Sequence, residues 1–123
     1  LIPGDDADEA VADIHRFLKK RLAFDFEFEP PWLSSPTLGD DDNGHLVESM
    51  LSHIEAVAGP HQKLGVPYGT HASRTCAAGV PSIVFGPGSI DQAHTKDEWI
   101  DIDQLEKAAE IYFRFCSNPT LAP

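Results

Sequence analysis

The sequence predicts an α/β fold, with helices layered against a sheet. Residues 80–85, VPSIVF, form an almost continuous apolar run between two glycines, which is typical of a strand covered on both faces. Residues 24–28 alternate strictly between phenylalanine and acidic side chains, a pattern that predicts a half-exposed strand. From residue 45 to residue 115, helical and strand patterns follow one another. Segments in this order predict layers of helices on a sheet.

The first segment, residues 6–22, has the pattern of an amphipathic helix. Asp5 or Asp6 can cap its start, and acidic residues follow in the first turn. Basic residues gather near its other end, where the helix dipole favours them. Its apolar residues recur at helical spacing: Ala10, Val11, Ile14, Phe17 and Leu18. The predicted strand at 24–28 follows and ends at Pro30-Pro31, and we interpret its phenylalanines as core residues.

A connector rich in Pro, Ser, Asp and Gly occupies residues 31–44, so we place a domain boundary near Pro30. A helix is predicted from His45 until Gly59-Pro60 stops it. The following elements are expected to be a strand at 63–68, a helix at 70–79, the strand at 80–85, a loop at 86–94, and a helix from 102 or 103 to 115. A lone helix and strand cannot close a core, so we expect residues 1–30 to pack against other segments.

The composition limits the classes to which the protein can belong. Its 123 residues, 41% of them hydrophobic, suit one compact domain. The net charge of -11 argues against nucleic acid or an anionic membrane as a partner, and no apolar run approaches the roughly 20 residues that span a bilayer. Cys76 and Cys116 form no CxxC pair, so we expect reduced, buried thiols in a cytoplasmic protein. The chain begins without Met or a secretory signal, so we expect it to start inside a longer protein.

Residues 86–103, GPGSIDQAHTKDEWIDID, are the most informative stretch. A Gly-Pro-Gly turn leaves the predicted buried strand, and His94 lies at the far end of the loop. Loops that follow strands in open α/β sheets are common ligand sites, and a neutral imidazole can bind a metal. A single loop histidine is more often a surface or hydrogen-bonding residue, so both interpretations stay open on spacing alone.

The segment GPGSIDQAHTKDEWIDIDQLEKAAEIY resembles the closing segment of acetylornithine deacetylases and related members of the M20 metallopeptidase family. In that family the histidine of this loop binds one of two zinc ions, which the resemblance places at His94. The acidic pair Asp97-Glu98 and the aromatic Trp99 also match. Tyr68-Gly69-Thr70 resembles the family's Gly-Thr turn near the substrate carboxylate. The N-terminal LIPG resembles the end of an Arg-x-x-Pro-Gly strand in the dimerisation (lid) domain.

The resemblance implies the C-terminal part of a zinc-exopeptidase-like α/β/α sandwich. Residues 1–30 would be the last helix and strand of an α+β lid domain, and residues 31–123 the C-terminal part of the catalytic α/β domain. The implied reaction uses metal-activated water to remove an N-acyl group from an amino acid. Acetylornithine is the substrate that the resemblance favours. His94 is the implied zinc ligand. Gly69, Thr70 and Gly88 are candidate substrate contacts, and the lid domain implies a homodimer as a candidate assembly.

The other ligands of a two-zinc centre cannot be matched. The family supplies them from an HxD segment, a bridging Asp, a Glu-Glu pair and a further acidic residue, and this sequence contains neither HxD nor Glu-Glu. Zinc sites normally use three or four protein ligands, so we expect the chain alone to be inactive and to need the remainder of the same polypeptide. Two alternatives stay open: a carboxypeptidase or dipeptidase of the same family, and a non-catalytic binding or dimerisation module.

Overall fold

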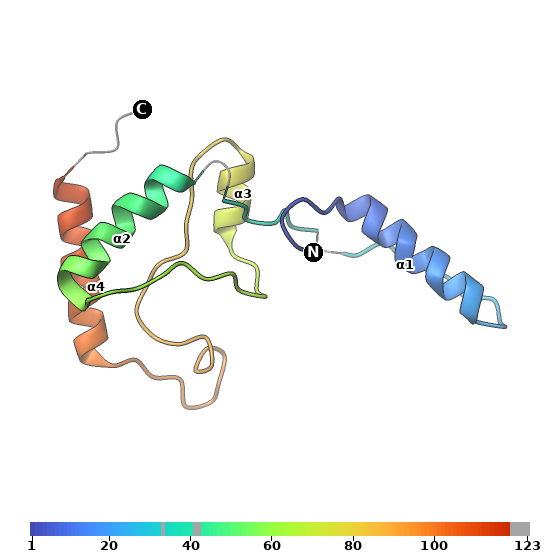
Figure 1. The fold of residues 1–123 in the computed structure, drawn as a ribbon. Helices are drawn as coiled ribbons and strands as arrows, with labels where there is room; N and C mark the ends of the chain where they lie inside the picture. The colour runs from blue at the N-terminus through green and yellow to red at the C-terminus, as the bar shows by residue number, and fades with distance from the viewer. Residues whose placement is uncertain (33, 41–42, 119–123) are drawn as a thin grey trace. The chain divides into compact units, whose positions relative to one another are not determined.

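The computed structural model describes residues 1–32, 34–40 and 43–118. The described residues form the helices α1 (Ala7–Arg21), α2 (Gly44–Ala58), α3 (His71–Ala77) and α4 (Ile102–Ser117) (Figure 1). Each begins and ends within a few residues of a predicted helix. The backbone divides into two compact units, which are described separately: Leu1–Asp42 with Tyr68–Ser82, and Asn43–Pro67 with Ile83–Pro123.

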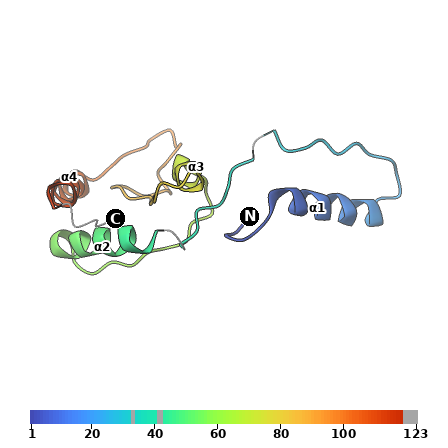
Figure 2. The same cartoon turned by 90° about the horizontal axis from the view of Figure 1, so that it is seen from above.

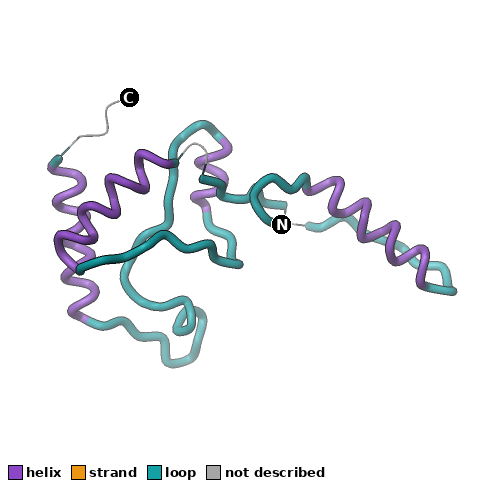
Figure 3. The backbone as a smooth tube through the Cα atoms, in the orientation of Figure 1, coloured by secondary structure: helices purple, strands orange, loops and turns teal. Residues whose placement is uncertain are grey.

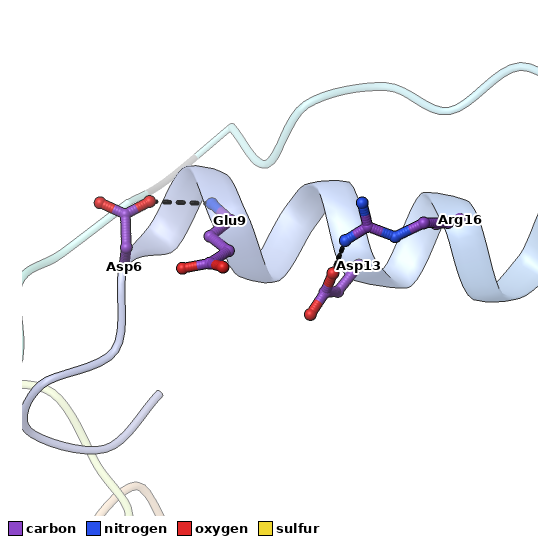
Figure 4. A network of polar contacts seen from close by, with 4 residues as sticks. All are labelled: Asp6, Glu9, Asp13 and Arg16. Carbon is purple, nitrogen blue, oxygen red and sulfur yellow. Dashed lines mark hydrogen bonds and ion pairs between the residues drawn. The ribbon is translucent and has the colours of Figure 1, made fainter.

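Helix α1 follows its sequence pattern closely. The carboxylate of Asp6 caps the helix by accepting a hydrogen bond from the backbone N–H of Glu9, at 2.8 Å (Figure 4). Acidic residues occupy the first turn and basic residues the last, as the helix dipole favours. No residue of α1 is buried, and the side chains of Ile14 and Phe17 are each 51% exposed. The apolar face of this helix is therefore formed but only partly covered, with Ala10, Val11 and Leu18 half-buried.

The segment that follows α1 turns back along the helix (Figure 2). The rings of Phe26 and Phe28 lie 5.7 and 5.5 Å from the His15 ring, and both phenylalanines are half-buried. Phe24 is 65% exposed. The prediction that these phenylalanines belong to a core is therefore wrong for the described residues. Phe26 and Phe28 pack against one histidine of a helix and stay half-exposed.

The second unit has the hydrophobic core. Met50 and Ile54 of α2 and Ile111 of α4 are almost fully buried, and α2 and α4 contact each other (Figure 1). Other apolar side chains pack against these three: Leu51, Val57, Ala58, Ile83, Phe85 and Phe115. The two helices meet through apolar residues spaced three or four apart, which share one side of each helix.

No strand forms within residues 1–32, 34–40 and 43–118, where the backbone between helices is irregular (Figure 3). The predicted strands at 24–28, 63–68 and 80–85 are therefore wrong for this structure, and these residues do not build the expected α/β/α sandwich. The physical reason is that a strand exists only when another strand satisfies its backbone groups. Phe26 and Phe28 have a helix beside them, and so do Ile83 and Phe85.

The apolar run 80–85 shows the difference most clearly. Ile83 and Phe85 pack against the core, while the side chains of Val80 and Val84 are 56% and 51% exposed. One face of this segment is covered, and not both as predicted. The alternation at residues 83–85 is still the period of two that an extended segment gives.

The structure also gives the exposure of the two cysteines and the character of the helices. Cys76 is half-buried and Cys116 is exposed, so the prediction of two buried thiols is wrong. None of the helices in the described part of the chain is long and apolar enough to cross a membrane.

Candidate functional site

The loop that carries His94 starts at the Gly86-Pro87-Gly88 turn. Gly88 has a φ of 96°, a left-handed value that favours glycine. Its backbone N–H donates a hydrogen bond of 2.8 Å to Oε1 of Gln104, in the first turn of α4. These residues are sixteen positions apart, so the bond closes the base of the loop. It also occupies the Gly88 N–H, a group through which the predicted substrate contact could have been made.

Inside the loop, tight turns set the path of the chain. The N–H of Gln92 donates to the Ser89 carbonyl at 3.0 Å, and the N–H of Ala93 donates to the Ile90 carbonyl at 3.1 Å. The Thr95 hydroxyl donates to the Gln92 carbonyl at 2.7 Å. These local bonds satisfy backbone groups that have no strand or helix partner.

His94 has an unusual backbone conformation. Its φ is 59°, in the left-handed region that non-glycine residues seldom adopt, although histidine does so more often than most. Its N–H donates to Oε2 of Glu98 at 3.2 Å. The second residue of the acidic pair therefore holds the backbone of the histidine that the sequence singled out. A local hydrogen bond of this kind offsets part of the cost of a strained residue.

The His94 side chain suits a metal ligand, but it does not make a site by itself. The residue is exposed, and in the described part of the chain its imidazole has no hydrogen-bond partner, so its nitrogens are accessible. Across the described residues no group of three or more His, Cys, Asp or Glu side chains is placed to hold a metal ion. A zinc site needs three or four protein ligands, so His94 can contribute one of them.

A shallow pocket lies between the loop and the start of α4. Gly88, Ser89 and Gln92 line it from the loop, Trp99 lines it from the segment before α4, and Gln104 lines it from the first turn of α4. The indole of Trp99 is 60% exposed. His94 does not line this pocket, so the structure gives no joint site formed by the pocket and the histidine.

The predicted contacts Gly69 and Thr70 lie in the other unit, before α3. Thr70 caps this helix: its hydroxyl accepts a hydrogen bond of 3.2 Å from the N–H of Ala72. The Ser73 hydroxyl donates to the Thr70 carbonyl at 2.9 Å and lies 3.3 Å from the Ser35 hydroxyl. Arg74 donates to the Ser34 carbonyl at 2.8 Å. The Gly-Thr turn is thus bonded to α3, and α3 in turn is bonded to the connector. A Cβ at Gly69 would meet open space.

Comparison with known families places these residues in one family. The family described as "Peptidase family M20/M25/M40" matches residues 4–118, nearly the whole chain. The chain belongs to this family. The match contains the His94 loop, the Gly-Thr turn and α1, so the M20 resemblance seen in the loop extends over all the described helices.

Individual relatives of this M20 chain are deacetylases. An N-acetyl-L-citrulline deacetylase of Xanthomonas campestris pv. campestris is 31% identical over 119 residues, covering 95% of this chain and 31% of the relative. An acetylornithine deacetylase of Yersinia pseudotuberculosis is 32% identical over 106 residues, covering 84% of this chain and 24% of the relative. One of Proteus mirabilis is 45% identical over 42 residues, covering 34% of this chain and 11% of the relative. No solved structure matches significantly.

The M20 chain therefore spans about a third or less of the length of these relatives. Sequence reasoning singled out His94 and its acidic neighbours, but it did not single out Gln104. A glutamine in the first turn of a helix has no distinctive pattern, and nothing local relates it to a glycine sixteen residues earlier. The bond from His94 to Glu98 spans four residues, so the acidic pair after the histidine was a usable signal.

Proposed function

We propose that this chain is the C-terminal part of a two-zinc amidohydrolase that removes the N-acyl group from an amino acid. The observation that supports this most directly is the loop GPGSIDQAHTKDEW, within a family match over residues 4–118. The relatives named above are deacetylases of acylated amino acids, which favours the same reaction class here. Acetylornithine and acetylcitrulline are the substrates that their names suggest.

In this proposal His94 binds one of the two zinc ions through its exposed imidazole. Bound zinc supplies a polarised acyl carbonyl and a hydroxide at near-neutral pH. The contribution of this chain is one ligand, held on a loop whose base and tip are each closed by a hydrogen bond. The remaining ligands and the acid/base carboxylate come from the rest of the polypeptide, because residues 1–123 contain neither HxD nor Glu-Glu.

Substrate contacts are proposed at the Gly69-Thr70 turn, as the family resemblance implies. The structure supports a limited version of this role. The Thr70 hydroxyl already accepts a bond from the Ala72 N–H, while the backbone around Gly69 is exposed and open. A substrate carboxylate would therefore meet backbone groups of the turn first. At Gly88 we propose a structural role beside the metal site, since its N–H is occupied by Gln104.

Exposed apolar surface supports the proposal that this chain packs against the rest of a longer polypeptide. Val80 and Val84 of the predicted strand and Ile14 and Phe17 of α1 are each at least 51% exposed. Backbone groups of a segment such as 80–85 can be paired by a neighbouring strand supplied from outside residues 1–123. We therefore retain the α/β catalytic domain at 31–123 and the lid segment at 1–30, with its homodimer, as parts of the proposal. A cytoplasmic location completes it.

The decisive experiment measures zinc in the purified full-length protein by elemental analysis. We expect two zinc ions per chain in the wild type, and fewer after His94→Ala or His94→Asn. Asn tolerates the left-handed φ of 59°, so the second variant removes the imidazole while keeping the loop conformation accessible. Deacetylation of acetylornithine should fall by orders of magnitude in both. Unchanged zinc content in both variants would exclude His94 as a ligand.

A matched control is available at His45, an exposed histidine on α2. His45→Ala should leave zinc content and turnover as in the wild type. The isolated chain 1–123 should bind zinc weakly in calorimetry and show no turnover, because one imidazole cannot hold the metal tightly. Tight stoichiometric binding by the isolated chain would contradict the proposal.

The peptidase description of the family keeps one alternative in view, an M20 carboxypeptidase or dipeptidase. Assaying the full-length protein with acetylornithine, acetylcitrulline and dipeptides separates the two. Hydrolysis of dipeptides with no release of acetate would establish the peptidase. The non-catalytic module would be supported if the residues encoded before Leu1 lacked HxD, bridging Asp and Glu-Glu segments.

A further inference from the structure

His94 lies on an exposed loop. A loop side chain binds a metal well only when its supporting contacts hold it in place beforehand. The loop between Phe85 and α4 contains no helix and no strand among its residues. Its conformation must therefore be fixed by particular hydrogen bonds, and by a rigid element to which those bonds lead.

Helix α4 is that rigid element. Ala108 and Ile111 are 5% and 2% exposed, and Ile111 belongs to the core cluster with Met50 and Ile54. The start of α4 is capped by Asp101, whose carboxylate accepts a hydrogen bond of 2.8 Å from the N–H of Asp103. A capped first turn, on a helix anchored in the core through Ile111, gives Gln104 a fixed position.

Gln104 uses this position to hold the beginning of the loop. Its Oε1 accepts the Gly88 N–H at 2.8 Å, near the best distance for such a bond. Gly88 has a φ of 96°, and a Cβ there would lie 4.0 Å from a side-chain carbon of Ile100. The turn and the segment before α4 are thus close together. Breaking the bond leaves the start of the loop held to α4 through the bond from the Tyr112 hydroxyl to the Phe85 carbonyl, so Gly88 and the residues after it can move more freely.

The effect reaches His94 through the loop itself. Turn bonds connect Ser89 to Gln92 and Gln92 to Thr95, and Glu98 then holds the His94 N–H. With both the base and the tip closed, the loop has fewer accessible backbone conformations. With the base open, the loop loses more conformational entropy when the imidazole binds a metal, so binding is weaker.

We propose that Gln104 is a positioning residue, which fixes the His94 loop for metal binding by accepting the Gly88 N–H. This inference rests on the proposed function, in which His94 binds zinc. It assigns no contact between Gln104 and zinc or substrate. The amide oxygen acts through the backbone of Gly88 alone.

Three variants of the full-length protein test the role. Gln104→Met keeps the length of the side chain and removes the acceptor. Gln104→Glu keeps an oxygen acceptor, and an acidic residue in the first turn suits the helix dipole. Gln92→Met is the matched control, since Gln92 lines the same pocket and its side chain accepts no described hydrogen bond. Circular dichroism establishes that each variant folds.

The first measurement is hydrogen exchange of a peptide that contains Gly88. We expect exchange about fivefold faster in Gln104→Met, as the loss of one hydrogen bond of roughly 1 kcal/mol predicts. The second measurement is zinc affinity by competition with a chelator. We expect it to fall by about tenfold or more in Gln104→Met, the usual effect of removing a partner that supports a metal ligand. Gln104→Glu and Gln92→Met should match the wild type in both.

Two results would overturn the inference. Faster exchange at Gly88 with unchanged zinc affinity would show that the bond is structural only. Equal losses of affinity in Gln104→Met and Gln92→Met would show that pocket packing matters and the acceptor does not. The proposed function fails separately, if the wild-type protein holds no zinc. In that case a difference in Gly88 exchange between the two methionine variants would still show that the bond orders the loop.

Discussion

The hydroxyl of Tyr112 on α4 donates a hydrogen bond of 2.7 Å to the carbonyl oxygen of Phe85, and the two rings meet edge to face with centroids 5.2 Å apart. Phe85 is the last residue before the Gly-Pro-Gly turn, and its side chain packs on the core. The bond therefore anchors the end of the 80–85 segment to α4. Together with the bond from Gly88 to Gln104, it ties the start of the His94 loop to one helix at two points.

Tyr112→Phe removes the hydroxyl and keeps the ring contact. We expect the free energy of unfolding to fall by about 0.5–1.5 kcal/mol, near the lower value because the bond is exposed. Urea unfolding of the full-length protein measures the change. Tyr112→Ala should cost more, since it also removes the edge-to-face contact. If Tyr112→Phe were as destabilising as Tyr112→Ala, the ring contact would contribute nothing.

The N-cap of α1 offers a second prediction. Asp6→Ala leaves the Glu9 N–H without its acceptor, so the first turn should open more easily, by about 1 kcal/mol (Figure 4). Hydrogen exchange of peptides from α1 reports this opening. Asp6→Asn keeps an acceptor and should restore protection. As a control, Asp13→Ala removes the exposed ion pair with Arg16, which should change exchange little.

The acidic pair after His94 gives a third prediction. Glu98→Ala removes the acceptor of the His94 N–H, so zinc affinity of the full-length protein should fall by about tenfold. Glu98→Gln retains an amide oxygen and should bind zinc nearly as the wild type does. Asp97→Ala is the neighbouring control and should have no effect. Equal losses in Glu98→Ala and Glu98→Gln would mean that the negative charge matters and the hydrogen bond does not.

The pKa of Lys107 gives the stability of the folded state a pH dependence of known sign. A hydrogen bond to Asp103, at 2.5 Å, and its negative charge raise the pKa of Lys107 above the ordinary 10.5. A raised lysine pKa stabilises the folded state below pH 10.5, and this contribution is lost as the pH rises through the folded pKa. The pair is exposed, so the effect should be small and should weaken with added salt.

An NMR titration of the Lys107 side chain measures this shift directly. Asp103→Asn should return the pKa of Lys107 toward 10.5, because the Asp103 charge is removed. Asp101 acts in the same direction as a smaller cause, so Asp101→Asn should lower the pKa less. An Asp103→Asn variant with an unchanged pKa would refute the assigned cause.

Much of the local structure could be predicted because its causes are local. Helical spacing, the acidic and basic ends of α1 and its capping residue Asp6 all act within a few positions of the chain. The family could be recognised for a similar reason, since GPGSIDQAHTKDEW is one continuous segment. The family match over residues 4–118 confirms that recognition.

The strand predictions were wrong because strand formation does not depend on local sequence alone. The alternating pattern at 24–28 and the apolar run at 80–85 indicate how residues would face a sheet, but a sheet also needs a paired neighbour. Those segments contact helices in the described structure, through His15 in one case and the α2–α4 core in the other. Apolar side chains pack in both segments, but they pack against helices and not beside a neighbouring strand.

The sequence by itself determined the helices, the Asp6 cap of α1, the family and the candidate ligand His94, because each depends on neighbours within a short stretch of chain. Only the tertiary structure decided how that ligand is held. Gln104 meets Gly88 sixteen residues away, and Tyr112 meets Phe85 across twenty-seven. Contacts at such separations form when α4 packs on α2 through Ile111, Met50 and Ile54, and no periodicity in the sequence encodes them.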